Sequence, residues 1–341
     1  MQFTKKQNFI FLLLLLALVF LFLVNISLGS VAIPIKEVVK GIFSQEMSKE
    51  SWEIILWNFR FPKAFTAILV GIGLSMSGLL MQTLFRNPLA GPYVLGLSSG
   101  ASLGVAFVIL GSGVLPIFIS TFFLSSYGLV LASSLGSFLV LMAVLIVSQK
   151  LKDTMAILIV GLMFGSFTSA IVSVLSYFTT AEKLQKFTFW SMGSISNLSW
   201  NEISLLTVFV AIGIGMSFLV IKPLNALLLG EKYAQSIGIN YKKTRFLIII
   251  ATSVLAGSIT AFAGPIAFIG LAVPHMTKLV FQTSNHFILF WGTLLIGAIV
   301  MLLCDTIAQV PGNDITLPIN AITSVIGAPI VIWLLVRKKR V

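Results

Sequence analysis

The longest uncharged stretch of the chain runs from Asn87 to Gln149 and contains no Asp, Glu, Lys or Arg. As one continuous helix it would be about 95 Å long, roughly three times the apolar thickness of a lipid bilayer. A single soluble core could not enclose so much apolar surface. We therefore expect this stretch to cross a membrane several times.

Charged and turn-forming residues divide the rest of the sequence in the same way. The pattern predicts about ten membrane spans, at residues 9–30, 64–85, 93–112, 123–148, 154–177, 203–221, 246–264, 267–282, 286–304 and 317–336. The predicted fold is all-α and integral to the membrane, with residues 1–341 forming a single transmembrane domain. The composition agrees, because only 9% of the residues are charged and the mean hydropathy is +1.07.

The basic residues indicate how the spans are oriented. If the N-terminus is cytoplasmic, most of the 22 Lys and Arg residues fall in cytoplasmic segments, and the C-terminus is cytoplasmic too. The positive-inside rule favours this topology. The net charge of +12 is then mostly an orientation signal, and we expect no nucleic-acid partner.

A short motif that occurs twice predicts an internal repeat. The sequence Ala-Gly-Pro at residues 90–92 is followed by Gly-Leu at 96–97, and the same two elements occur at 263–265 and 270–271. An odd number of predicted spans separates the copies, so the two halves would have inverted topology, as is common in transporters. Chance repetition in an apolar sequence is the alternative.

Groups that could perform catalysis or bind metal are nearly absent from the predicted spans. Asp305 is the only acidic residue near the interior of a span, and His275 and His286 are too few for a metal site. The chain lacks the Gly-x-x-x-x-Gly-Lys-Ser/Thr sequence of P-loop nucleotide hydrolases. We expect no enzyme activity, no metal and no cofactor, so energy for transport would come from elsewhere.

Two predicted spans carry a face of small and weakly polar residues. The face in the fifth span comprises Gly161, Gly165, Ser169, Ser173 and Ser176. The face in the second span comprises Gly71, Ser75, Gly78 and Gln82. This spacing favours close helix packing. The functional interpretation is the wall of a translocation pathway that binds nothing tightly, which suits a large solute delivered by another protein.

One predicted cytoplasmic loop, residues 223–245, is unusually long. A short helix is expected at about 224–238, ending near Gly238. Its candidate contact residues combine apolar and polar side chains: Leu224, Leu227, Leu228, Glu231, Lys232 and Gln235. The segment either lies on lipid as an interfacial helix or docks to a cytoplasmic partner.

Arg60 and Lys63 form a basic pair just before the second span, on the predicted extracytoplasmic side. Most other segments on that side are not basic, so the pair is a local exception. The two side chains either anchor the chain by reaching toward lipid headgroups or bind acidic groups of a protein partner.

Several longer motifs resemble the permease subunits of the FecCD family, which belong to ATP-binding-cassette importers of iron siderophores, haem and cobalamin. These motifs are Arg60-Phe61-Pro62-Lys63, Arg86-Asn87-Pro88-Leu89-Ala90-Gly91-Pro92, Leu95-Gly96, Ser98-Ser99-Gly100-Ala101, Gly264-Pro265-Ile266-Ala267-Phe268-Ile269-Gly270-Leu271, Pro274-His275, Leu317-Pro318 and Gly327-Ala328-Pro329. They follow the family's order and extend over nearly the whole chain.

The resemblance implies a ten-helix permease of the bacterial inner membrane, similar to the vitamin B12 importer, that pairs with a second copy or a close homologue. It also implies two cytoplasmic ATPase subunits docked around residues 224–240 and an extracytoplasmic binding protein whose acids pair with Arg60 and Lys63. The fifth span would line the route.

Lys63 departs from the family by replacing an arginine, which removes bidentate carboxylate geometry. Gln309 stands where some relatives have a further docking arginine, and Thr316 replaces the usual acid before Leu-Pro.

The leading hypothesis is therefore a transport subunit without its own ATPase site, working as a homodimer rather than a heterodimer. Its ligand would be a siderophore, haem or cobalamin, and the sequence does not choose among them. The alternative is an ion-coupled secondary transporter or channel that acts alone.

Overall fold

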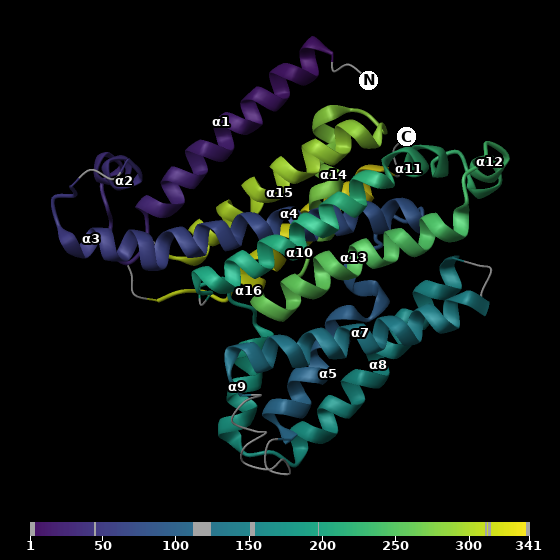
Figure 1. The fold of residues 1–341 in the computed structure, drawn as a ribbon, viewed down its shortest axis with the longest axis horizontal. Helices are drawn as coiled ribbons and strands as arrows, with labels where there is room; N and C mark the ends of the chain where they lie inside the picture. The colour runs from purple at the N-terminus through teal and green to yellow at the C-terminus, as the bar shows by residue number, and fades with distance from the viewer. Residues whose placement is uncertain are drawn as a thin grey trace. The chain divides into compact units, whose positions relative to one another are not determined.

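The structure is a computed structural model that describes residues 4–43, 46–111, 124–150, 154–196, 198–310, 312 and 315–338. Within this part of the chain the regular structure is entirely helical (Figure 1).

In the described part of the chain, one helix corresponds to each of the ten predicted spans. These helices are α1 (Lys5–Ser27), α4 (Phe61–Leu84), α5 (Leu97–Ile109), α7 (Ser126–Lys150), α8 (Thr154–Tyr177), α10 (Trp200–Leu219), α13 (Tyr241–Ala263), α14 (Ile269–Phe281), α15 (His286–Ala308) and α16 (Ile319–Lys338). Among the described residues, seven helical segments are long and apolar enough to cross a bilayer, and the apolar parts of α5, α14 and α16 are shorter. The predicted all-α membrane fold is confirmed, with ten as an approximate number of spans.

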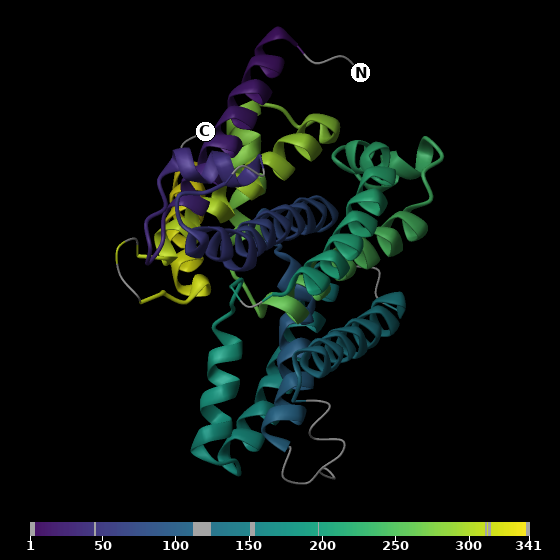
Figure 2. The same ribbon diagram turned by 60° about the vertical axis from the view of Figure 1, so that its left-hand side comes forward.

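Shorter elements connect these helices. They are α2 (Ile35–Ile42), α3 (Glu50–Ile55), the π-helix η1 (Leu56–Arg60), the 3-10 helix η2 (Pro92–Leu95), α9 (Ala181–Ser191), α11 (Ile221–Leu227) and α12 (Glu231–Ser236). α3, η1 and α4 form one continuous helical segment. Only residues 178–180 separate α8 from α9, and the chain turns sharply there (Figure 2).

The long helices form two series of five with matched lengths. α1, α4, α5, α7 and α8 contain 23, 24, 13, 25 and 24 residues. α10, α13, α14, α15 and α16 contain 20, 23, 13, 23 and 20 residues. In both series a residue with left-handed backbone directly precedes the 13-residue helix, namely Gly96 (φ 77°) and Phe268 (φ 65°). This correspondence supports the internal repeat predicted from the paired Ala-Gly-Pro motifs.

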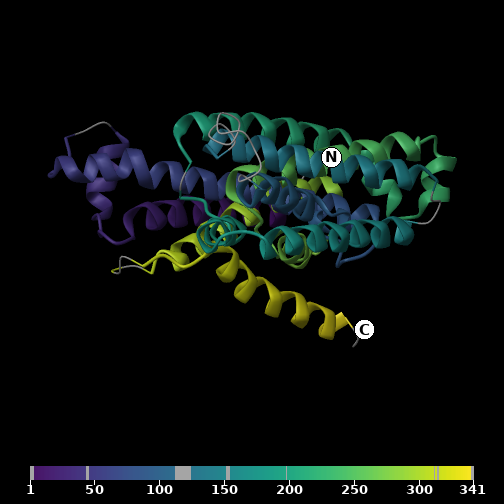
Figure 3. The same cartoon turned by 90° about the horizontal axis from the view of Figure 1, so that it is seen from below.

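The chain divides into two compact units, and each combines helices from both series. Unit 1 contains residues 1–79, 194–208 and 267–341, and unit 2 contains residues 80–193 and 209–266. In unit 2, α13 of the second series packs against α5 and α7 of the first. In unit 1, α16 packs against α14 and α15, and its C-terminal end projects away from them (Figure 3).

Glycine permits the closest helix crossings in both units. In unit 2, a Cβ added to Gly100 would lie 2.5 Å from the carbonyl oxygen of Gly136 on α7. In unit 1, a Cβ on Gly78 would collide with the carbonyl of Gly270 on α14, and one on Gly71 would collide with the backbone of α15. Backbones therefore touch at these crossings, as small-residue spacing allows. The small-residue face of α4 is a packing surface over this part of its length.

Candidate functional site

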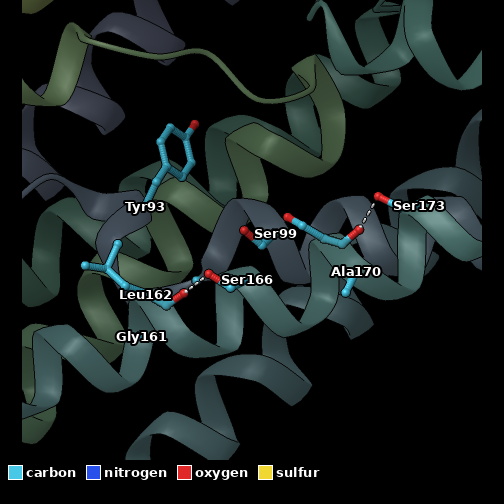
Figure 4. Close-up of a pocket in the computed structure, with 10 residues that line it drawn as sticks. Tyr93, Ser99, Gly161, Leu162, Ser166, Ala170 and Ser173 are labelled. Carbon is cyan, nitrogen blue, oxygen red and sulfur yellow. Dashed lines mark hydrogen bonds between the residues drawn. The ribbon is translucent and has the colours of Figure 1, made fainter.

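Unit 2 contains an open cavity of about 580 Å³ between the η2–α5 segment and α8 (Figure 4). Its lining residues are Tyr93, Gly96, Ser99, Gly161, Leu162, Gly165, Ser166, Ser169, Ala170 and Ser173. None of these side chains carries a formal charge. The wall offers hydroxyl groups and space but no fixed charge, so it can contact a bulky solute without holding an ion tightly.

The small-residue face of α8 that was predicted from the sequence is buried at one end and exposed at the other. Gly161 is buried and Gly165 is half-buried. A Cβ on Gly165 would lie 3.3 Å from the hydroxyl oxygen of Ser99 on α5. Ser169 and Ser173 are exposed, and the Ser173 hydroxyl donates a hydrogen bond to the Ser169 carbonyl (2.9 Å). The face therefore packs closely at one end and opens into the cavity at the other.

Two residues predicted for the pathway do not line this cavity. Ser176 lies one turn beyond Ser173 on α8 and is half-buried. Gln82 is on α4 and is only 3% exposed. Its helix face is the one that Gly71 and Gly78 use for packing. The burial of Gln82 therefore does not support its assignment to a pathway wall.

Tyr93 connects the two copies of the repeated motif. Its hydroxyl oxygen accepts hydrogen bonds from the backbone N–H of Ile266 (3.4 Å) and from the Thr260 hydroxyl (3.3 Å). Tyr93 follows the first Ala-Gly-Pro sequence, and Ile266 follows the second. Tyr93 also lines the cavity. The segment before α5 and the segment after α13 therefore meet at the edge of the cavity. Sequence reasoning missed Tyr93, although its place beside the repeated motif could have singled it out.

The basic pair predicted to dock a binding protein lies in unit 1, and neither side chain is free. Arg60 is 8% exposed, and its Nη2 donates a hydrogen bond to the Val31 carbonyl (2.7 Å). Lys63 Nζ lies 3.1 Å from Oδ1 of Asp305, and these two side chains are 12% and 1% exposed. Docking to an acidic partner would have to share or replace these interactions. The docking role of the pair stays a prediction.

The carboxylate of Asp305 binds three polar side chains. Besides Lys63 of α4, its carboxylate accepts hydrogen bonds at Oδ2 from Asn25 of α1 (2.9 Å) and from Gln309 beyond α15 (2.8 Å). Arg60 interacts with it electrostatically. A buried carboxylate needs such compensation. The network therefore ties the ends of three helices of unit 1 together, which the sequence did not reveal.

The predicted coupling helix is two helices rather than one. α11 ends at Leu227, α12 begins at Glu231, and Gly230 between them has a φ of 120°. The Arg86 guanidinium donates hydrogen bonds from Nε (3.2 Å) and Nη2 (2.8 Å) to the Leu227 carbonyl. The expectation of one continuous helix over 224–238 is wrong, because Gly230 leaves the helical region and Arg86 binds the end of α11.

Only part of the predicted coupling surface faces outward in this chain. Leu224 and Leu227 are 2% and 4% exposed. The exposed members of the predicted set are Leu228, Glu231, Lys232 and Gln235. Gln235 donates a hydrogen bond to Glu231 on the same helix (3.1 Å). The contact with an ATPase stays a prediction, and these outward side chains are its candidates.

The long apolar helices define a multi-pass membrane protein, and comparison with known proteins gives its family. The model of the FecCD transport family matches residues 16–337, so the chain belongs to that family. It is thus a permease subunit of an ABC importer, a multi-pass inner-membrane protein that is not an enzyme, because ATP hydrolysis belongs to separate subunits. The family predicted from the sequence motifs is confirmed.

Individual relatives agree with this assignment. The vitamin B12 import system permease protein BtuC of Salmonella typhi is 35% identical over 289 residues, which cover 84% of this chain and 85% of that protein. BtuC of Salmonella arizonae is also 35% identical over 289 residues, with coverage of 84% for both chains.

Solved structures show the same fold. A structure described as an inward-facing conformation of a metal-chelate type ABC transporter matches with a TM-score of 0.84 and 30% identity, covering 97% of this chain and 99% of that chain. PsaBC from Streptococcus pneumoniae in complex with a Fab matches with a TM-score of 0.54 and 15% identity, covering 86% and 94%, and supports the fold alone.

Proposed function

We propose that this permease carries a large metal chelate, either a corrinoid or an iron chelate such as a ferric siderophore or haem, into the cytoplasm. The uncharged, hydroxyl-lined cavity of unit 2 is the observation that carries the proposal. A wall without fixed charge suits a bulky ligand whose metal is already held by its own organic groups. The similarity to vitamin B12 import permeases and to a metal-chelate type transporter supports the same class.

The working assembly is a homodimer that receives its ligand from an extracytoplasmic binding protein and is driven by two cytoplasmic ATPase subunits. The exposed serine side of α8 provides a surface on which a second copy would complete the route. Both termini are cytoplasmic, as the distribution of Lys and Arg favours. Leu228, Glu231, Lys232 and Gln235 would meet the ATPase, and Arg60 and Lys63 would meet the binding protein.

Uptake by the assembled transporter tests the ligand class. The permease, together with its ATPase and binding-protein partners, is placed in proteoliposomes and offered radiolabelled cyanocobalamin, haemin or a ferric siderophore in turn. ATP-dependent uptake of one of the three is expected. Uptake of none of them, together with uptake of a free metal ion or a small metabolite, would contradict the proposal.

Serine substitutions test the route. Ser169→Leu and Ser173→Leu fill the cavity, and we expect them to reduce uptake strongly while leaving ATPase binding intact. Ser176→Leu changes the same residue type on the same helix outside the lining and should be milder. Equal uptake by all three variants and the unsubstituted protein would exclude this cavity from the route.

A further inference from the structure

α2 carries an exposed apolar stripe although it is a connecting helix. Ile35, Val39 and Phe43 occur at i, i+4 and i+8, so they share one side of this eight-residue helix and its C-cap. Their exposed fractions are 48%, 38% and 71%. Lys36 and Lys40 follow two of them in the sequence and lie along one edge of the stripe. Surrounding lipid explains apolar exposure on a spanning helix, but the stripe on α2 requires its own explanation.

The opposite side of α2 is fixed to unit 1. A Cβ on Gly41 would lie 2.6 Å from the side chain of Leu56, so the helix packs closely there. The Glu37 carboxylate accepts hydrogen bonds from Lys40 Nζ (2.8 Å) and from the backbone N–H of Ser48 (2.8 Å). α2 therefore cannot roll over to hide its stripe without losing these contacts.

The connection from α1 places α2 at the membrane surface. Across this connection the Ser27 hydroxyl donates a hydrogen bond to the Ile33 carbonyl (2.5 Å), and the Ile33 N–H donates one to the Ser27 carbonyl (3.0 Å). Arg60 Nη2 donates a hydrogen bond to the Val31 carbonyl (2.7 Å). α1 has the length of a span, about 34 Å. Its end therefore lies near the lipid–water boundary, and α2 and α3 lie close to that end (Figures 1 and 3).

We propose that α2 is an interfacial anchor whose stripe of Ile35, Val39 and Phe43 inserts into the headgroup–acyl boundary of the adjacent leaflet. Amphipathic helices of this kind insert about 5–10 Å. Lys36, which is exposed, can reach lipid phosphates from the edge of the stripe, while Lys40 is paired with Glu37. Continuity with α1 and the exposed Lys36 favour lipid over a protein partner as the occupant. The anchor does not depend on which ligand the permease carries.

Single-cysteine labelling tests the anchor because the natural cysteine, Cys304, is unique in the sequence and buried. In a Cys304→Ala background, Val39→Cys and Phe43→Cys are labelled with an environment-sensitive fluorophore and the full permease is reconstituted into vesicles. Leu16→Cys, on the exposed side of α1, is the lipid-facing control, and Glu53→Cys on α3 is the exposed control. Brominated acyl chains and aqueous iodide are used as the two quenchers.

Lipid insertion predicts that brominated acyl chains reduce the fluorescence of both α2 labels by about two-fold, as at Leu16, while iodide quenches them weakly. The Glu53 label should show the reverse. The proposal is overturned if the α2 labels respond to iodide as Glu53 does. It is also overturned if they escape iodide only after addition of the binding protein, which would make the stripe a protein contact.

Discussion

Removal of Lys63 should destabilise unit 1, because it leaves the Asp305 carboxylate buried without its ion-pair partner. Asp305 is 1% exposed, and the Nζ–Oδ1 distance is 3.1 Å. Breaking a buried pair by removing one partner typically costs about 3–5 kcal/mol. Asp305 retains hydrogen bonds from Asn25 (2.9 Å) and Gln309 (2.8 Å). We therefore expect Lys63→Met to lower the free energy of unfolding by about 2–4 kcal/mol.

A double-mutant cycle separates this effect from loss of packing. Asp305→Asn removes the buried charge, so Lys63→Met together with Asp305→Asn should be less destabilised than the sum of the single variants by at least about 1.5 kcal/mol. Equilibrium unfolding in mixed detergent–SDS micelles, followed by tryptophan fluorescence, measures the four free energies.

The exposed ion pair of α9 provides the matched control. Lys186 and Glu182 are separated by 2.9 Å, but their side chains are 63% and 76% exposed. Lys186→Met should therefore leave the unfolding curve unchanged, since water screens such pairs. The reasoning that burial strengthens the Lys63–Asp305 pair would be refuted by either of two results. One is that the losses in free energy of unfolding of the two single variants add up in the double variant, and the other is that Lys186→Met lowers this free energy as much as Lys63→Met does.

Three further predictions concern other parts of the fold. Gly136→Ala should destabilise by about 1–3 kcal/mol because its Cβ meets the backbone of α5, whereas Gly257→Ala, with nothing within 4 Å, should be neutral or stabilising in the same unfolding assay. Arg86→Ala should speed amide hydrogen exchange at the end of α11 by about tenfold, and unchanged exchange would refute the capping role. The pKa of Glu37 is lowered from 4.5 to about 2 by hydrogen bonds from Lys40 and Ser48. Ionised Glu37 should therefore stabilise the fold at neutral pH, and this stabilisation should be lost as the pH falls from about 5 toward 2. In thermal unfolding, Glu37→Gln should reduce the drop in melting temperature over this pH range.

The sequence predicted the long helices well because each is a long apolar run bounded by charge or turn residues. It missed α9, where Glu182, Lys183 and Lys186 interrupt the apolar pattern. It also predicted one coupling helix instead of α11 and α12, since the φ of Gly230 and the bonds from Arg86 depend on tertiary contact. A glycine in such a segment is tolerated by helices and does not by itself mark a break.

The candidate site was predicted in part. Small residues at i+4 spacing on α8 identified the cavity wall through Ser169 and Ser173, because helix periodicity is readable from sequence. The same pattern on α4 led to Gln82, which is buried, since periodicity does not say what a face packs against. Asp305 was recognised as unusual, but its pairing with Lys63 joins residues far apart in the sequence, and only the fold brings them together.

The central claim is that this chain is a conduit whose power comes from separate subunits. It is tested most directly by reconstituting the purified permease in vesicles with and without its ATPase, and following uptake of the labelled metal chelate delivered by the binding protein. The account predicts uptake only when the ATPase, ATP and the binding protein are all present. Uptake by the permease alone, driven by a proton or sodium gradient, would contradict it.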